Sequence, residues 1–161
     1  MVRCVVNPLV RAWYVISGRM ATNPLAAPVN ARLYRLTRGR GFDRALGAPV
    51  VLLTTRGRKT GERRSAPVFG FADGDRVIVV ASNAGRDKHP AWYVNLRADP
   101  EVEVGGRSRR MRAREAVGEE RERLWALVSR CYRGYEAYRE VTDRRIPVVA
   151  LEPPASAQLG E

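Results

Sequence analysis

The sequence predicts an α+β protein built on antiparallel strands, closed as a barrel or packed as a sandwich, with helices around it. Asp73-Gly74 and Gly105-Gly106 each separate two strand-like stretches and suit two-residue hairpin turns. These stretches are residues 68–72, 76–81, 101–104 and 107–115. Residues 77–81 are apolar at every position, so this strand is expected to be buried on both faces.

The first 40 residues are expected to form a separate N-terminal helical segment. On a helical wheel, one face of this stretch is apolar and the opposite face carries cationic, polar or small residues. The apolar face holds Cys4, Val5, Leu9, Ala12, Trp13 and Ile16. The opposite face holds Arg3, Asn7, Arg11 and Gly18. We expect the apolar face to pack on the protein's own core, with a membrane-surface or lid helix as the alternative. Residues 20–28 are predicted as a linker, and a second short helix is expected around Val29, Leu33 and Leu36.

Residues 54–65 carry the densest cluster of cations, opposed only by Glu62. Strand-like residues precede and follow them, at 50–53 and 66–72, so the cations should lie on a turn between strands. Gly57 and Gly61 let the backbone approach a ligand, and neighbouring hydroxyls add donors. The turn is therefore predicted to bind an anion, with a solvated hairpin loop as the alternative. The order of Lys59-Thr60 before Gly61 excludes a Walker A phosphate loop.

The later elements follow in order. Residues 83–87 form a polar loop, His89-Pro90 should open a short helix, and a helix should begin after Gly118 with its core stripe at Leu124, Leu127, Val128 and Cys131. In the strand after Gly106, arginines alternate with apolar residues, so one face should be wet and the other packed. A final strand is expected at residues 146–151, followed by a tail at 154–161.

The formal charge is +12 over 161 residues, with a pI near 10.9. This charge indicates an anionic partner: a nucleic acid, an anionic membrane surface or a polyanionic small molecule. The two cysteines, Cys4 and Cys131, form neither a disulfide framework nor a zinc motif, so a reducing cytoplasm is the expected compartment. His89 is the only histidine and is read as a capping or packing residue, because no nucleophile motif accompanies it.

Several ordered motifs resemble the deazaflavin-dependent nitroreductase family. They are Leu-Leu-Thr-Thr-Arg-Gly-Arg-Lys-Thr-Gly (52–61), Val-Val-Ala-Ser-Asn (79–83), Lys-His-Pro-Ala-Trp-Tyr-Val-Asn-Leu (88–96), Gly-Tyr-Glu-Ala-Tyr (134–138) and Ile-Pro-Val-Val-Ala-Leu-Glu-Pro (146–153). The resemblance covers about two-thirds of the chain and excludes the first forty or so residues. It implies a split β-barrel at residues 41–153, like that of flavin reductases and pyridoxamine oxidases, that binds the 8-hydroxy-5-deazaflavin coenzyme F420.

The resemblance also implies roles for individual residues. The coenzyme-binding set is Arg58, Lys59, Thr60, Arg64, Pro67, Val80, Ala81, Ser82, Asn83, Lys88 and Trp92, in which Arg58, Lys59, Thr60 and Arg64 hold the phosphate and acidic tail. The proposed catalytic residues are Ser82, Tyr135 and Tyr138, and the acceptor would contact Phe69, Tyr135 and Tyr138. A tyrosine row spaced three apart can instead belong to a core edge or an interface.

The implied activity is hydride transfer from reduced coenzyme F420 to a quinone, an enone or a nitroaromatic acceptor. Phe69 and Asn83 depart from the tyrosine and lysine common in nitroreducing members, so the resemblance leaves nitroimidazole reduction open. The alternatives are the same barrel binding FMN and a basic nucleic-acid-binding barrel. A homodimer and a peripheral membrane contact through residues 1–20 also stay open.

Overall fold

The computed structural model describes residues 8–21, 44–45, 48–105 and 108–154. The linker and second helix predicted within residues 20–41 therefore fall almost entirely outside the described residues. The elements, in chain order, are α1 (Pro8–Ala21), β1 (Arg44–Ala45), β2 (Ala48–Arg56), β3 (Arg63–Asp73), β4 (Arg76–Val80), η1 (Asn83–Gly85), α3 (Ala91–Ala98), β5 (Glu101–Val104), β6 (Arg109–Glu115), α4 (Gly118–Cys131), α5 (Gly134–Glu140) and β7 (Val148–Glu152).

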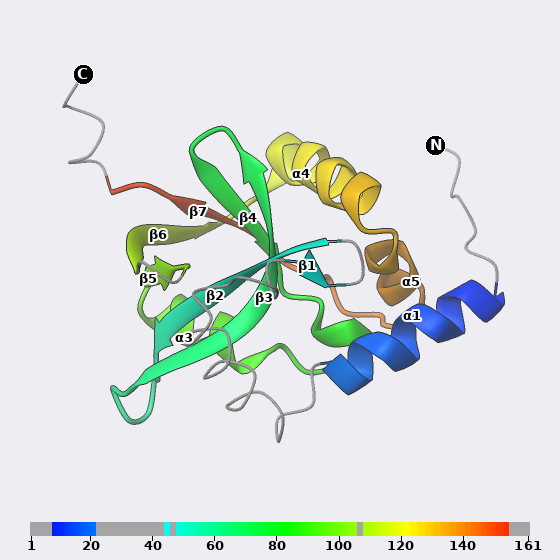
Figure 1. Ribbon diagram of the computed structural model, residues 1–161, viewed down its shortest axis with the longest axis horizontal. Coiled ribbons are helices and arrows are strands. Elements are labelled where there is room, and N and C mark those ends of the chain that lie inside the picture. Colours follow the sequence, from blue (N-terminus) through cyan, green and yellow to red (C-terminus); the bar gives the residue numbers. More distant parts are fainter. Residues whose placement is uncertain (1–7, 22–43, 46–47, 106–107, 155–161) are drawn as a thin grey trace.

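The strands form one antiparallel sheet in the order β1-β2-β3-β4-β7-β6-β5, and β2 also pairs with β5. This extra pairing joins the two ends of the sheet and closes six strands into a barrel, while β1 extends the edge of β2. Closure leaves fewer open strand edges, which would otherwise offer unpaired backbone groups. The predicted split β-barrel of antiparallel strands with flanking helices is confirmed (Figure 1).

The strand predictions hold with small shifts. Asp73 pairs with Arg76, so the first hairpin turns at Gly74 and Asp75, and Gly74 has φ +65°. The second hairpin is longer than the predicted two-residue turn, because Val104 pairs with Arg109. Four residues, 105–108, therefore connect its strands.

Two apolar clusters lie on opposite faces of the central strand β4. Val79 belongs to a cluster with residues of β2, α3, β5, β6 and β7, whereas Ile78 and Val80 face α4 and α5. Ile78, Val79 and Val80 are all buried, which confirms the expected burial on both faces. On β6, Met111 and Ala113 are buried and the alternating arginines are exposed, as predicted.

Helix α4 differs from the prediction in its stripe. Leu124 and Val128 are buried as expected, and Leu127 is partly buried. Cys131, however, is exposed, and the indole of Trp125 is buried in its place, 4 % accessible. Cys131 is the last residue of the helix, where the chain turns toward α5, so the stripe ends before it.

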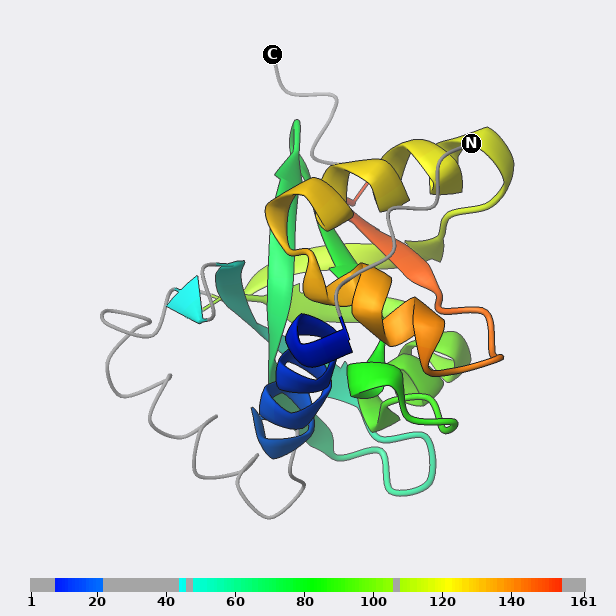
Figure 2. The same cartoon turned by 90° about the vertical axis from the view of Figure 1, so that its right-hand side faces the viewer.

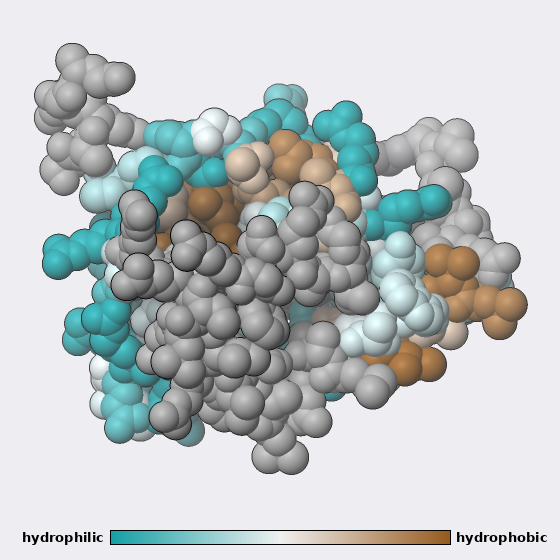
Figure 3. Space-filling view, viewed as in Figure 1, coloured by the Kyte–Doolittle hydropathy of each residue, from teal (hydrophilic) through white to brown (hydrophobic). Residues whose placement is uncertain are grey.

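Helix α1 lies beside α5 (Figures 1 and 2), but its contact face is not the one predicted. Tyr14 and Val15 pack against the core cluster, and Gly18 is buried against α5. Leu9, Trp13 and Ile16, assigned to the packed face, are instead 81 %, 55 % and 59 % exposed. Figure 3 shows the resulting apolar patch over α1, at the right-hand end of the molecule. The assignment was wrong because the small Gly18 allows a closer approach than the larger side chains do.

Candidate functional site

The cationic turn is held in a defined shape by its own backbone. Strands β2 and β3 pair as far as Arg56 with Arg63. The N–H of Gly57 then donates to the carbonyl of Glu62 at 2.7 Å, and the N–H of Gly61 donates to the carbonyl of Gly57 at 2.7 Å. Gly61 has φ +70°, which favours glycine. The turn at residues 57–62 therefore presents its side chains on a fixed loop.

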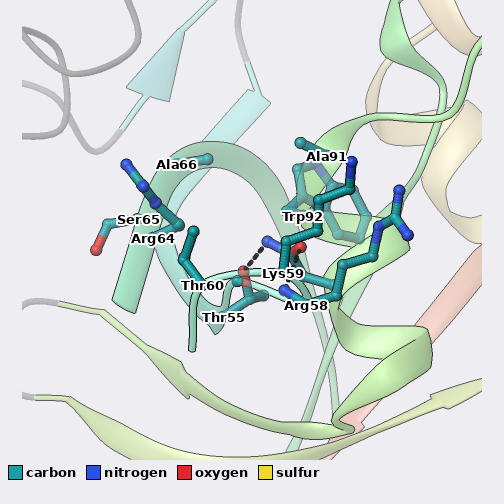
Figure 4. Close-up of a pocket in the computed structure, with 11 residues that line it drawn as sticks. Thr55, Arg58, Lys59, Thr60, Arg64, Ser65, Ala66, Ala91 and Trp92 are labelled. Atoms are coloured by element: carbon teal, nitrogen blue, oxygen red, sulfur yellow. Dashed lines mark hydrogen bonds between the residues drawn. The ribbon is translucent and has the colours of Figure 1, made fainter. Parts of the chain in front are cut away.

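A pocket of about 400 Å³ opens between this turn and α3. Its lining residues are Thr55, Gly57, Arg58, Lys59, Thr60, Arg64, Ser65, Ala66, Ala91, Trp92 and Asn95. Five members of the predicted coenzyme set, Arg58, Lys59, Thr60, Arg64 and Trp92, line this one pocket. Figure 4 shows Arg58 and Lys59 on the side of Trp92, with Arg64 across the pocket near Ala66.

The cations of the turn differ in their partners. Arg63 pairs with Glu103, Arg64 with Glu62, and Arg56 with Asp99. By contrast, the side chains of Arg58 and Lys59 have no ion-pair partner in the described part of the chain. These two charges, together with the Thr60 hydroxyl, are available to an anion in the pocket.

Asn95 is a pocket residue that the sequence reading missed. Its Oδ1 accepts a hydrogen bond from the backbone N–H of Arg58 at 3.2 Å, and its Nδ2 donates to the Thr55 hydroxyl at 3.2 Å. Thr55 is 2 % exposed and would otherwise be a buried hydroxyl with fewer partners. Asn95 thus joins α3 to the turn, and an amide inside an otherwise apolar helical stretch was the available signal.

The other predicted coenzyme residues do not line this pocket. Pro67 is half-buried in β3, next to the pocket residue Ala66. Three residues at the end of β4, Val80, Ala81 and Ser82, are buried, and Asn83 is half-buried. Lys88 is exposed, and its carbonyl accepts a hydrogen bond from Asn83 Nδ2 at 2.8 Å.

The tyrosine row lies in the core. Tyr135 and Tyr138 are 2 % and 3 % exposed, and Tyr132 joins them in the same cluster. The Tyr132 and Tyr138 hydroxyls lie 3.0 Å apart, and the Tyr138 hydroxyl donates to the carbonyl of Tyr14 on α1 at 3.2 Å. Burial raises the pKa of Tyr135 well above its ordinary value. The row therefore stays protonated, and α1 covers it.

Phe69 contacts this cluster from the sheet side. Its ring centroid lies 4.8 Å from that of Tyr132, and the residue is half-buried. Together with Tyr132 it belongs to an aromatic network that continues to Tyr14 and Tyr135. The predicted acceptor residues Phe69, Tyr135 and Tyr138 are thus neighbours in one cluster, apart from the cationic pocket.

His89 packs rather than ligates. Its ring centroid lies 4.8 Å from that of Tyr93, and its Nδ1 lies 3.2 Å from Nη1 of Arg144. Within the residues described, no group of three or more acidic, histidine or cysteine side chains could hold a metal ion. These contacts agree with the reading of His89 as a packing residue, and its lack of a catalytic role stays a prediction.

Two of the four arginines of β6 form ion pairs with acidic residues. Arg112 pairs with Glu101, and Arg114 pairs with Glu120 and Glu152 at 2.7 Å each. Hydrogen bonds from Arg114 and Arg76, partly offset by burial, lower the pKa of Glu120 to about 2. Because acids pair with Arg112 and Arg114, these two arginines no longer support a nucleic-acid-binding barrel.

Known proteins match the chain over most of its length. Residues 27–153 match the family model for F420H(2)-dependent quinone reductase. The F420H(2)-dependent quinone reductase Rv1261c of Mycobacterium tuberculosis is 37 % identical over 125 residues, covering 74 % of this chain and 84 % of that protein.

Two solved structures share the fold. One, titled as a structure of an F420-H2 dependent reductase (FDR-A), has a TM-score of 0.60 and 41 % identity, covering 68 % of this chain and 98 % of the other. The second, titled as a domain-swapped dimer, has a TM-score of 0.61 and 36 % identity, covering 78 % of this chain and all of the other (100 %).

Proposed function

Because the chain belongs to the F420H(2)-dependent quinone reductase family, we propose that its cationic pocket binds the anionic part of coenzyme F420. The protein is a coenzyme F420-dependent oxidoreductase of the quinone reductase type. One observation carries the site assignment: Arg58 and Lys59 lack ion-pair partners among the described residues and line a pocket with Thr60 and Arg64.

The donor set fits the coenzyme's phosphodiester and polyglutamate tail. Guanidinium and ammonium groups are strong donors to phosphate and carboxylate oxygens. The turn itself requires a small residue at Gly57, because a Cβ there would lie 2.9 Å from the Thr60 hydroxyl oxygen. When bound, the coenzyme supplies a hydride, and carbon in place of the flavin N5 makes it a poor one-electron donor.

The ring is proposed to lie against Trp92, Pro67 and the loop that begins at the buried Ser82. An indole face offers a stacking surface for a planar ring. In this assignment the protein orients the ring and excludes water, while Ser82 and the backbone of residues 80–83 offer polar contacts. Lys88 is proposed to add a cation at the rim of this loop.

The aromatic cluster is proposed as the wall of the acceptor side. Phe69 is its half-buried member, while Tyr135 and Tyr138 lie deeper, below α1. An acceptor therefore reaches Tyr138 only if α1 moves from its place over the cluster. Burial raises the pKa of Tyr138, which keeps its hydroxyl protonated and able to donate a hydrogen bond.

The decisive experiment is a tryptophan-fluorescence titration of the protein with oxidised coenzyme F420 and, in parallel, with FMN. We expect tight quenching by coenzyme F420 and little by FMN. A double variant, Arg58→Glu with Lys59→Glu, should weaken coenzyme binding by roughly 100-fold or more, since each lost charge-assisted hydrogen bond costs about 1.5–3 kcal/mol.

The matched control for the single change Arg58→Glu is Arg110→Glu, which reverses one charge on the exposed face of β6, away from the pocket. Its affinity for coenzyme F420 should stay within about twofold of the unaltered protein at moderate salt. Equal weakening in both variants would show that net charge, rather than the pocket, attracts the coenzyme. Preferential binding of FMN would overturn the cofactor assignment.

Helix α1 is proposed to dock on an anionic membrane surface. No helix in the described residues is long and apolar enough to cross a membrane. Leu9, Trp13 and Ile16 nevertheless form an exposed apolar patch, and the chain's net charge of +12 would draw it to anionic lipids. A surface position suits a reductase of quinones, which are apolar.

Docking is tested by co-sedimentation with vesicles of anionic phospholipid, comparing the unaltered protein with a Leu9→Ser, Ile16→Ser variant. The variant leaves the packed residues Tyr14 and Val15 in place. Weaker sedimentation of the variant is expected. Equal co-sedimentation of the two proteins would refute the proposal. If sedimentation velocity without vesicles shows a dimer for the unaltered protein and a monomer for the variant, the patch binds a second copy of the chain instead.

A further inference from the structure

Arg144 lies between α5 and β7, and its half-buried guanidinium group binds the loop that follows β4. Its Nη2 donates to the carbonyl of Ser82 at 2.6 Å and to that of Ala81 at 3.0 Å. Its Nε donates to the carbonyl of Arg86 at 2.8 Å. One planar side chain thus holds both ends of the loop at residues 81–86, which a single flexible ammonium group could not match in geometry.

The loop has a backbone that needs outside support. Asn83, Ala84 and Gly85 follow one another with φ of +47°, +53° and +72°. Glycine adopts this region freely and asparagine tolerates it, but alanine does so at a cost that the surroundings must outweigh. Asn83 Nδ2 supplies one restraint by donating to the carbonyl of Lys88. The three hydrogen bonds from Arg144 are the larger set.

The charge of Arg144 has unusual partners. Among the described residues, its contacts are three carbonyls and one imidazole, and no carboxylate lies within ion-pair distance. Burial lowers the pKa of Arg144, but an arginine stays charged near neutral pH. Asp87 acts on Arg144 only from beyond ion-pair distance, so the hydrogen bonds to the loop, rather than an ion pair, hold the guanidinium group in place.

Arg144 also fixes the protonation state of His89. A guanidinium group only donates, so His89 Nδ1, 3.2 Å from Nη1, must accept and the ring proton must lie on Nε2. The imidazole packs on Tyr93 of α3. Through this contact Arg144 also restrains the start of the helix that carries Trp92.

We propose that Arg144 is a positioning residue for hydride transfer, which sets the loop at residues 81–86 and the start of α3 relative to each other. The inference rests on the proposed function, because Ser82, Asn83 and Trp92 are the residues assigned there to the coenzyme ring. Misplacing a reactant by about 1 Å can lower a reaction rate by roughly 100-fold. A residue that touches no reactant can therefore control the rate.

The test compares Arg144→Gln and Arg144→Lys with the control Arg145→Gln, which removes the same charge from an exposed neighbour. Two measurements need no coenzyme: amide hydrogen exchange of residues 81–86, and ¹⁵N NMR of the His89 ring. We expect amide exchange at residues 81–86 to be at least about tenfold faster in both Arg144 variants, and the single Nε2–H tautomer of His89 to be lost in Arg144→Gln. The Arg145 variant should match the unaltered protein.

The same variants are then assayed for coenzyme affinity by fluorescence and for quinone reduction. We expect a drop of roughly 10- to 100-fold in kcat for the Arg144 variants and little change in the KM for the quinone. If Arg144→Gln does not fold, Arg144→Lys decides, because it keeps the charge and loses only the fork. Unchanged exchange would overturn the inference, and so would faster exchange with unchanged affinity and kcat.

Failure of the proposed function would look different. The unaltered protein would then not bind coenzyme F420 at all, whatever the exchange of residues 81–86 in the Arg144 variants. In that case Arg144 would restrain the loop without a role in hydride transfer, and the positioning proposal would fall with the site assignment.

Discussion

Gly18 offers the sharpest test of how α1 is held. A Cβ at this position would lie 2.1 Å from the Tyr138 hydroxyl oxygen, 2.9 Å from its Cζ and 3.1 Å from the Cβ of Ala84. The Tyr138 ring cannot swing away easily, because it is 3 % exposed and its hydroxyl bonds to Tyr132 and Tyr14. Gly18→Ala must therefore push α1 away from α5.

Two opposing effects decide the sign of the change. Alanine is favoured over glycine in a helix by about 1 kcal/mol. Overpacking a tight contact costs about 1–3 kcal/mol, and separation of α1 would also expose Tyr14 and Val15. We expect the second effect to win, with a net loss of about 1–2 kcal/mol in the free energy of unfolding.

Urea unfolding followed by fluorescence measures this loss, and amide exchange of residues 8–21 shows whether α1 detaches. A double-mutant cycle with Tyr138→Phe isolates the cause, since that change removes the oxygen nearest the new methyl group. The loss of unfolding free energy in the double variant should be smaller than the sum of the losses in the two single variants by roughly 1 kcal/mol. A Gly18→Ala protein that is more stable than the unaltered one, with unchanged exchange in α1, would refute the reasoning.

Three further predictions concern charge and the pocket. Burial, Arg144 and Arg97 lower the pKa of His89, while Glu115 opposes them, so the unfolded chain takes up the proton at a higher pH than the folded protein does. The free energy of unfolding should therefore fall as the pH drops below about 6.5. In His89→Gln the midpoint of urea unfolding should not show this fall between pH 7.5 and pH 5.5. Hydrogen bonds from Arg123 and Arg76, partly offset by burial, lower the pKa of Asp73 to about 2, so its stabilisation should be lost as the pH falls from about 4 to below 2. Asp73→Asn should therefore cost about 1 kcal/mol at pH 7 and only a small part of that at pH 2, measured by the same assay. Asn95→Ala should weaken coenzyme affinity several-fold in the fluorescence titration, which corresponds to the free energy of roughly one hydrogen bond. An unchanged affinity would show that the turn keeps its shape without Asn95.

The antiparallel strands could be predicted because their signals are local, whereas closure into a barrel rather than a sandwich was expected only from the family resemblance. An unbroken apolar strand, alternation on β6 and the glycine-containing turn at Gly74 each depend on a few neighbouring residues, and these matched the structure. The length of the second hairpin loop could not be read, because it depends on which residues of β5 and β6 pair. Pairing register is a property of two segments, and Gly105-Gly106 fixes only where a turn falls.

The orientation of α1 shows a different limit. A helical wheel finds an apolar face, but packing is decided by the partner surface, here α5 and η1. Gly18 allows the closest approach, and the aromatic Tyr14 fills the gap beside it. For the same reason Trp125 is buried and Cys131 is exposed on α4, since burial depends on contact with a neighbouring element and not on hydropathy alone.

The site shows where composition alone misleads about charge. An excess of twelve positive charges favoured a nucleic acid as strongly as a coenzyme. Pairing in three dimensions separates them: Arg112 and Arg114, on the strand that resembled a nucleic-acid surface, are matched by acids, whereas Arg58 and Lys59 are not matched among the described residues. Arg58 and Lys59 both lack an ion-pair partner among the described residues and both line the pocket, so the position of such charges, rather than their sum, indicates the partner.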